Sequence, residues 1–156
     1  MPVLCQPAVV LPEHTISLQE TLERTRRLHK DHPRLSLALR LISNTGVARR
    51  HLVQPLDLTL RPPGLEERPR VYVRAVRKLV PAVVKQALHT ADLAPDEIGA
   101  SVFVSCTGFT MPSPTAWMIN SLGFRTDTTQ LPIAQLGCAA GGAAINRQLV
   151  LRPSRR

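Results

Sequence analysis

Residues 131–144 read LPIAQLGCAAGGAA, an apolar, β-prone run that passes directly into glycine and alanine around one cysteine. The first six residues predict a buried strand, and the remainder predicts the first turns of a helix. Gly141 and Gly142 each cost about 1 kcal/mol in a helix interior, so close packing inside a core is the expected compensation. The segment therefore predicts a strand-to-helix junction with Cys138 at the helix N-terminus.

A cysteine at such a junction is a candidate nucleophile. The free N–H groups and the positive end of the helix dipole favour the thiolate, which is the form that attacks a carbonyl carbon. Two alternatives stay open: Cys138 packs among small residues, or the glycines cradle a phosphate. The spacing G-x-x-x-G-G differs from the dinucleotide-binding G-x-G-x-x-G. The histidines all precede residue 90, and each is expected at the surface rather than as a base for Cys138: His14, His29, His32, His51 and His89.

Strand and helix signals alternate upstream of this junction. Residues 100–106 (ASVFVSC) predict a buried strand, and residues 112–122 predict a short helix closed by Gly123. Apolar residues recur at helical spacing over 70–91, where Pro81 marks a kink or the start of a second helix. The alternation predicts an α/β fold with a mostly parallel sheet.

The first third of the chain carries a clear helix start. Ser17-Leu-Gln-Glu20 is a capping box, in which the Ser17 and Glu20 side chains satisfy unpaired backbone N–H groups at the start of a helix that runs to about residue 30. Four prolines between residues 54 and 69 predict a loop. The remaining expected elements are a strand over 3–11, a helix over 35–43 and a short strand over 49–53.

Composition indicates one globular domain. The 156 residues are 44% hydrophobic and 20% charged, which excludes a disordered tail and a disulfide-stapled mini-protein. No apolar run reaches the roughly 18 residues of a membrane span, and no secretory signal opens the chain, so we expect no membrane partner and a cytoplasmic location. Cys5, Cys106 and Cys138 form no CxxC pair, so free thiols and no metal site are expected.

The charge balance raises nucleic acid as a partner. Twenty basic against eleven acidic residues give a formal charge of +9. The basic residues are almost all arginines spread along the chain, and five aromatic residues leave little for stacking bases. We therefore expect a solvated, arginine-rich surface and no nucleic-acid partner.

Four segments together resemble the N-terminal part of bacterial type III polyketide synthases of the chalcone and stilbene synthase family, closest to the alkylpyrone (germicidin-type) synthases. They are VLPEHTISLQETL (10–22), RLISNTGVARRHLVQP (40–55), VSCTGFTMPSPTAWMINSLGF (104–124) and QLPIAQLGCAAGGAAINR (130–147). The resemblance implies a thiolase-like α/β fold, of which this chain holds the N-terminal half only, and a homodimer in the intact family.

The resemblance also implies an activity and a nucleophile. Such enzymes load an acyl group from an acyl-CoA onto a cysteine, here Cys138, and condense it with the enolate of a decarboxylated malonyl-CoA-type extender. An α-pyrone-type product is expected, with CoA thioesters as substrates and no cofactor. Arg40 stands where the family contacts the CoA phosphates, a contact that suits the guanidinium fork. Asn44 stands where some relatives carry a second basic contact.

Three further positions are implied to form the pocket. Cys106 and Thr107 match residues that line the starter and cyclisation pocket. Met111 matches a methionine that reaches across the dimer interface into the partner's pocket, and ordinary core packing is the alternative for it.

The pattern of the family breaks after Arg147, where the chain continues QLVLRPSRR and stops at less than half the family's length. We therefore expect a partial N-terminal domain over 3–147 and a divergent basic tail over 148–156. The expected protein is a truncated synthase that is inactive alone, because the histidine and asparagine that stabilise the thioester oxygen belong to the absent half. The alternative is a non-catalytic remnant, or a partner that associates with a full-length synthase.

Overall fold

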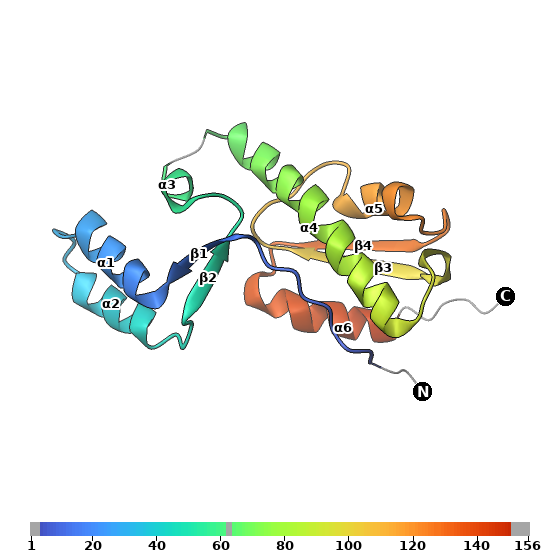
Figure 1. Cartoon of the computed structure of the whole chain (residues 1–156), viewed down its shortest axis with the longest axis horizontal. Helices are drawn as coiled ribbons and strands as arrows, with labels where there is room; N and C mark the ends of the chain where they lie inside the picture. The colour runs from blue at the N-terminus through green and yellow to red at the C-terminus, as the bar shows by residue number, and fades with distance from the viewer. Residues whose placement is uncertain (1–3, 62–63, 151–156) are drawn as a thin grey trace. The chain divides into compact units, whose positions relative to one another are not determined.

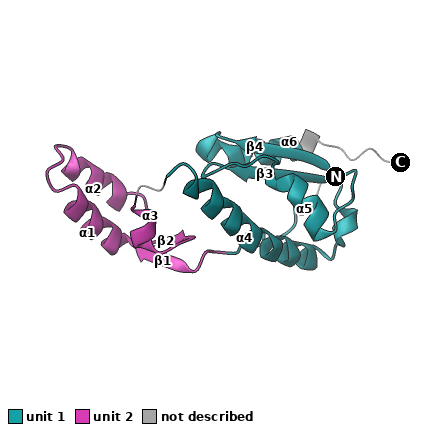
Figure 2. Cartoon of the chain, turned by 90° about the horizontal axis from the view of Figure 1, so that it is seen from above, with its two compact units in different colours: residues 1–10, 63–156 teal, residues 11–62 magenta. Residues whose placement is uncertain are grey.

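The computed structural model of the chain describes residues 4–61 and 64–150. The chain divides into two compact units, coloured separately in Figure 2. The small unit comprises residues 11–61, and the large unit comprises residues 4–10 and 64–150. Among these residues, no helix has the length and apolar character needed to cross a membrane.

The small unit is built on an antiparallel strand pair. Strand β1 (His14–Ser17) pairs with β2 (Arg49–Leu52), and Ile16, which lies opposite Arg50, is buried. Helices α1 (Leu18–Leu28), α2 (Leu35–Ser43) and α3 (Leu56–Thr59) complete the unit. The helices predicted after the capping box and over 35–43, and the strand predicted near 49–53, are confirmed. The sequence patterns did not predict β1 or α3.

The capping box at the start of α1 is complete. The Ser17 hydroxyl oxygen accepts a hydrogen bond from the Glu20 N–H at 3.1 Å, and the Glu20 carboxylate accepts from the Ser17 N–H at 2.8 Å. The Ser17 hydroxyl also donates to that carboxylate at 2.7 Å. These bonds, first that from the Ser17 backbone and then that from its side chain, hold the pKa of Glu20 below its ordinary value.

The large unit is built on a parallel strand pair. Strands β3 (Ala100–Ser105) and β4 (Thr129–Ala134) run in register from Ala100 opposite Thr129 to Ser105 opposite Ala134, which confirms the predicted parallel pairing. Helix α5 (Pro114–Leu122) connects the two strands, and α4 (Glu67–Ala91) precedes them. Helices α4 and α5 lie on one side of the strands, and α6 (Ala140–Val150) lies on the other (Figure 1).

The core of the large unit lies between α5 and α4. Met118, Ile119 and Phe124 are buried at its centre, against Val80, Val84, Leu88, Ile98, Phe103, Trp117 and Leu122. The apolar stripe predicted for residues 70–91 is thus the face that α4 turns to the core. Pro81 lies inside one continuous helix, so the alternative of a second helix starting there is wrong. The helix also begins at Glu67, inside the predicted loop.

The strand predicted over 3–11 is wrong for residues 4–11, and Val3 lies outside the described residues. A β-prone run becomes a strand only when a neighbour pairs with its backbone groups. In the described residues β3 and β4 pair with each other and leave this segment without a ladder. Leu4 is accordingly 90% exposed and Val9 65% exposed.

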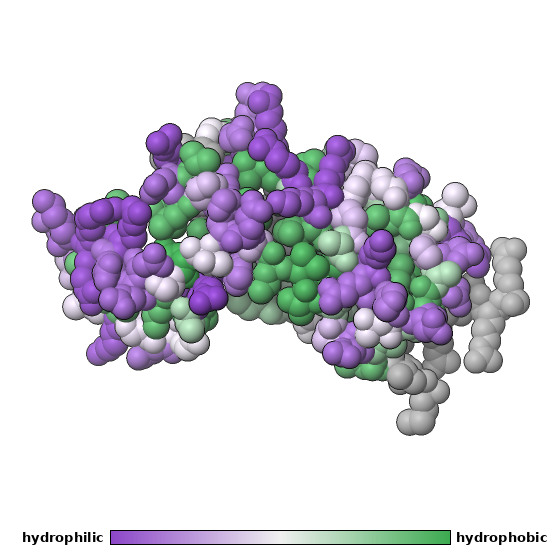
Figure 3. All heavy atoms as spheres, viewed as in Figure 1, coloured by the Kyte–Doolittle hydropathy of each residue, from purple (hydrophilic) through white to green (hydrophobic). Residues whose placement is uncertain are grey.

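Apolar side chains remain exposed in both units. Figure 3 shows many of them in green on the visible face of the molecule. The expected full burial of β3 and β4 is wrong in consequence: Ser101 is the buried residue of β3, and β4 alternates half-buried with exposed positions. The helices that pack on the two strands leave these positions partly open to solvent.

The capping box should stabilise α1 in a pH-dependent way. Substitution Ser17→Ala removes the cap, and we expect α1 to lose about 1 kcal/mol near neutral pH. Because the pKa of Glu20 is lowered on folding, its contribution is present above its unfolded pKa and is lost as the pH falls through its folded pKa. Hydrogen exchange of the α1 amides measures both effects. The control Ser36→Ala, at an exposed α2 position, should change little. Equal exchange in wild type and Ser17→Ala would contradict the capping role.

Candidate active site

Cys138 lies in a tight turn between β4 and α6. Two residues of this turn have left-handed backbone conformations, Gln135 with φ 65° and Gly137 with φ 53°. Residues Gly137–Ala139 then form one 3-10 turn, and α6 begins at Ala140. The predicted strand-to-helix junction is therefore present, with Cys138 exposed two residues before the helix starts. Exposure also removes the alternative in which Cys138 is a buried packing residue.

The paired glycines of α6 do not pack as expected. A Cβ placed on Gly141 or Gly142 would meet nothing within 4 Å, so the predicted close packing of both residues is wrong in the described structure. Over residues 140–148 of α6, whose burial is described, Ala140 is the one buried residue, with 1% exposure. The glycines instead leave bare backbone on the surface of α6.

The turn that follows β3 lies at the same edge of the sheet as the Cys138 turn. Parallel strands end at a common edge, and here Ser105 and Ala134 are the last paired residues. The Gln135 N–H donates to the Ser105 carbonyl at 3.4 Å and holds the two turns together. Cys106 and Thr107 follow Ser105 directly and are both exposed. The fold thus brings the segments of Cys106, Thr107 and Cys138 to one edge.

A cavity of about 320 Å³ opens at this edge. Cys106, Thr107 and Cys138 do not line this cavity, but residues close to them in the chain do. Its walls come from α4, β3, the loop before α5 and the end of β4: Tyr72, Phe103, Ser105, Gly108, Phe109, Thr110, Met111, Ser113, Pro114, Pro132, Ile133, Ala134 and Gln135. The arrangement is an apolar pocket beside a strand-to-helix cysteine.

Met111 is 86% exposed, so the alternative of ordinary core packing is wrong for it. Its loop also presents Phe109, which is 65% exposed. Both side chains reach outward while Met111 still lines the 320 Å³ cavity. This geometry suits a residue that contacts another surface.

The two residues expected at the CoA phosphates belong to the small unit. Arg40 lies in the last turn of α2, and Asn44 follows the helix as its C-cap, one turn further on. Both side chains are exposed. Residues four apart share a helix face, so the small unit presents them side by side.

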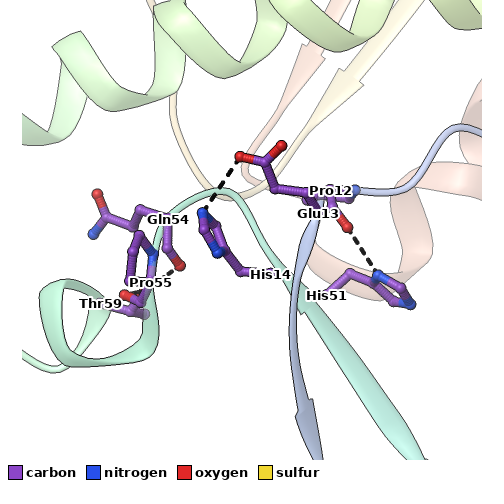
Figure 4. Close-up of polar contacts among 7 residues, drawn as sticks. All are labelled: Pro12, Glu13, His14, His51, Gln54, Pro55 and Thr59. Carbon is purple, nitrogen blue, oxygen red and sulfur yellow. Dashed lines mark hydrogen bonds and ion pairs between the residues drawn. The ribbon is translucent and has the colours of Figure 1, made fainter.

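Two of the histidines are engaged locally in the small unit (Figure 4). The Nδ1 of His51 lies 2.9 Å from the Pro12 carbonyl oxygen. The Nε2 of His14 lies 3.5 Å from a carboxylate oxygen of Glu13. Within the part of the chain that the structure describes, no three His, Cys, Asp or Glu side chains gather into a group that could hold a metal ion.

Sequence reasoning missed two residues of this edge. Gln135 adopts a positive φ that normally favours glycine, and no sequence pattern signals it. Tyr72 comes from α4, distant in sequence, and its ring lies against Gly108. The only available signal was Gly108 itself, because a glycine between polar and aromatic residues can mark a close approach.

Comparison with known proteins identifies the family. Residues 8–152 match the model of the FAE1/type III polyketide synthase-like protein family, and the chain therefore belongs to that family. It is 59% identical over 147 residues to the 1,3,6,8-tetrahydroxynaphthalene synthase of Streptomyces coelicolor, which covers 94% of this chain and 39% of the relative. It is 48% identical to the phloroglucinol synthase of Pseudomonas fluorescens, over 94% of this chain and 42% of the relative.

Solved structures confirm the predicted fold, the N-terminal part of a thiolase-like synthase. The crystal structure of the S. coelicolor tetrahydroxynaphthalene synthase superposes with a TM-score of 0.91 at 58% identity, over 96% of this chain and 43% of that one. Germicidin synthase from S. coelicolor superposes with a TM-score of 0.78 at 24% identity, over 94% of this chain and 46% of that one. The resemblance to germicidin synthase therefore supports the fold alone.

The chain spans about two-fifths of the length of the relatives that it matches. Helix α6 extends through residues 148–150 of the predicted basic tail, and residues 151–156 lie outside the described part of the chain. The boundary expected at Arg147 stays a prediction.

Two glycines near Cys138 should respond to alanine in opposite directions. Gly137→Ala puts a Cβ on a left-handed residue and should cost about 1 kcal/mol. Gly141→Ala adds a Cβ in open space on α6 and should gain about 0.5–1 kcal/mol. Urea unfolding measures both variants. Equal stability of the two variants would contradict the turn geometry described for Cys138.

Proposed function

We propose that this chain supplies the nucleophile, and part of the pocket, of a type III polyketide synthase. The observation that carries the proposal is Cys138, exposed in a strand-to-helix turn beside an apolar cavity, in a chain of this family. The Cys138 thiolate attacks the carbonyl carbon of an acyl-CoA, the C–S bond to CoA breaks, and the CoA thiolate leaves with its electron pair. The product is a thioester on Cys138.

The second step is a decarboxylative condensation. A malonyl-CoA-type extender loses carbon dioxide, and its enolate carbon attacks the acyl group and expels the Cys138 thiolate. The developing enolate oxygen needs fixed hydrogen-bond donors, a contribution usually worth several kcal/mol. The family resemblance assigns these donors to a histidine and an asparagine beyond the segment that this chain matches. We therefore propose that the 156-residue chain loads an acyl group but does not condense it. CoA thioesters are substrates, and the chemistry needs no resident cofactor.

The product class follows from the relatives. Those with 48–59% identity are named for tetrahydroxynaphthalene and phloroglucinol, both polyhydroxylated aromatic rings. Their names favour an aromatic polyphenol over the α-pyrone expected from the sequence, because the germicidin synthase is only 24% identical. Ring closure to a polyphenol is thus our proposal for the complete enzyme, and the α-pyrone is the alternative.

A partner is also proposed. The intact family is expected to form homodimers, and Met111 and Phe109 are exposed on the loop assigned to that contact. Burial of such side chains favours association by roughly 25 cal/mol per Å² of apolar surface, from which the entropy cost of association is subtracted. The same surface serves the alternative role, in which the chain associates with a full-length synthase without catalysing a reaction itself.

Acyl loading should depend on Cys138. The purified chain, incubated with a labelled medium-chain acyl-CoA and separately with malonyl-CoA, should gain the mass of one acyl group on the Cys138 peptide. Cys138→Ala should abolish this adduct, whereas Cys5→Ala, the matched removal of another exposed thiol, should leave it unchanged. Peptide mass spectrometry measures the adduct. A folded protein that gains no adduct on Cys138 would refute the loading step, and polyketide product from the chain alone would refute the proposed need for further residues.

Arg40 should contribute to CoA binding through its charge. Arg40→Ala should weaken CoA binding roughly fivefold at low salt, about 1 kcal/mol for an exposed ion pair. The difference should shrink above about 0.5 M salt because the pair is screened. Isothermal titration of CoA measures it. The control Arg26→Ala removes one exposed charge from α1 of the same unit and should have little effect. An equal loss in both variants would show a nonspecific charge effect.

A further inference from the structure

The ring of Tyr72 lies directly against the backbone of Gly108. A Cβ placed on Gly108 would lie 2.6 Å from Cγ and 2.7 Å from Cδ2 of the Tyr72 ring. Carbon atoms prefer separations of about 3.5–4.0 Å, so no side chain fits there unless the ring or the loop moves. A Cβ placed on Gly123 would lie 3.7 Å from the Pro95 Cβ, and one placed on Gly46, Gly64, Gly137, Gly141 or Gly142 would meet nothing within 4 Å.

A hydrogen bond fixes Gly108 as well. The Ser105 hydroxyl donates to the Gly108 carbonyl oxygen at 2.6 Å and closes a turn over residues 105–108. Gly108 is thus held by the end of β3 on one side and by the α4 ring on the other. Cys106 and Thr107 lie at the tip of this turn, where both are exposed. The Tyr72 ring therefore lies against the turn that carries both residues.

Tyr72 also lies in the walls of two cavities. One is the 320 Å³ cavity at the site edge, and the other is a cavity of about 360 Å³ between α4, α5 and the loop before α5. Thr110, Met111 and Pro114 line both cavities as well. A displacement of the ring would therefore change the shape of the pocket and the path of its loop together.

The hydroxyl of Tyr72 plays no visible part in this packing. Its oxygen is buried and forms no hydrogen bond with any residue in the described ranges 4–61 and 64–150. A buried hydroxyl without a partner is a cost to the fold. The loop therefore contacts the ring of Tyr72 and not its hydroxyl.

We propose that Tyr72 is a positioning residue, whose ring, fitted against Gly108, sets the path of the 105–111 loop and thereby the acyl groups that the pocket accepts. The proposal rests on the proposed function for its effect on acyl groups. Its structural part, the position of Cys106, is independent of any acyl transfer.

Four variants test the contact: Gly108→Ala, Tyr72→Ala, the double variant, and Tyr72→Phe, which keeps the ring and removes the hydroxyl. The first readout is the iodoacetamide alkylation rate of Cys106 relative to Cys5 in the same molecule, measured by peptide mass spectrometry. Gly108→Ala should change this ratio several-fold, and Tyr72→Phe should leave it at the wild-type value. In the double variant the ratio should match that of Tyr72→Ala, since without the ring the added methyl group meets no obstacle.

A ratio for Gly108→Ala equal to that of the wild type, or additive effects in the double variant, would overturn the proposal. If circular dichroism shows that Gly108→Ala does not fold, Tyr72→Ala decides alone: a changed ratio, with Tyr72→Phe unchanged, supports the proposal, and an unchanged ratio overturns it.

The second readout is the dependence of Cys138 loading on acyl chain length, from acetyl-CoA to octanoyl-CoA. The preferred length should shift in Tyr72→Ala and stay unchanged in Tyr72→Phe. An unshifted preference would overturn the selectivity part of the proposal. Absence of loading in every variant, including the wild type, would instead count against the proposed function, while the Cys106 ratios still test the positioning role.

Discussion

The parallel pairing of β3 with β4 determines where every candidate catalytic group of the large unit lies. Because the two strands run in the same direction, their carboxyl ends share one edge, and the residues that follow each strand meet there. The hydrogen bond from the Gln135 N–H to the Ser105 carbonyl oxygen extends this pairing by one step into the turns. Without the pairing, Cys106 and Cys138 would be two unrelated exposed thiols.

The core of the large unit supports that pairing from one side. Helix α5 connects the strands and buries Met118 and Ile119 against α4. Tyr72 lies on the same helix, about two turns before Val80 of the core, so one helix contributes both to the core and to the pocket wall. Packing of α4 is therefore a condition for the shape of the site as well as for stability.

The sequence predicted those elements whose signals are local. The leucine spacing over residues 35–43 and the Ser17–Glu20 box specify α2 and the start of α1 without reference to the rest of the chain. The strand predicted for residues 4–11 was wrong because strand formation depends on a neighbouring strand, which no local pattern reveals. The place of Cys138 at a strand-to-helix junction was predictable because its turn combines a strand signal, a cysteine and glycines in one run. The contact of Tyr72 was missed because it is made with Gly108, a glycine far along the chain.

The aromatic residues of the chain divide unevenly between the two units. Trp117, Tyr72 and the three phenylalanines all lie in the large unit, and residues 11–62 contain none. The Arg77 guanidinium lies over the Trp117 ring, 6.0 Å from its centroid, and both residues line the 360 Å³ cavity. Tryptophan fluorescence, excited selectively, therefore reports on the α4–α5 surface from one residue, Trp117. The small unit has no aromatic residue and is silent in fluorescence, so the unfolding of the two units can be separated optically against the far-ultraviolet signal that both share.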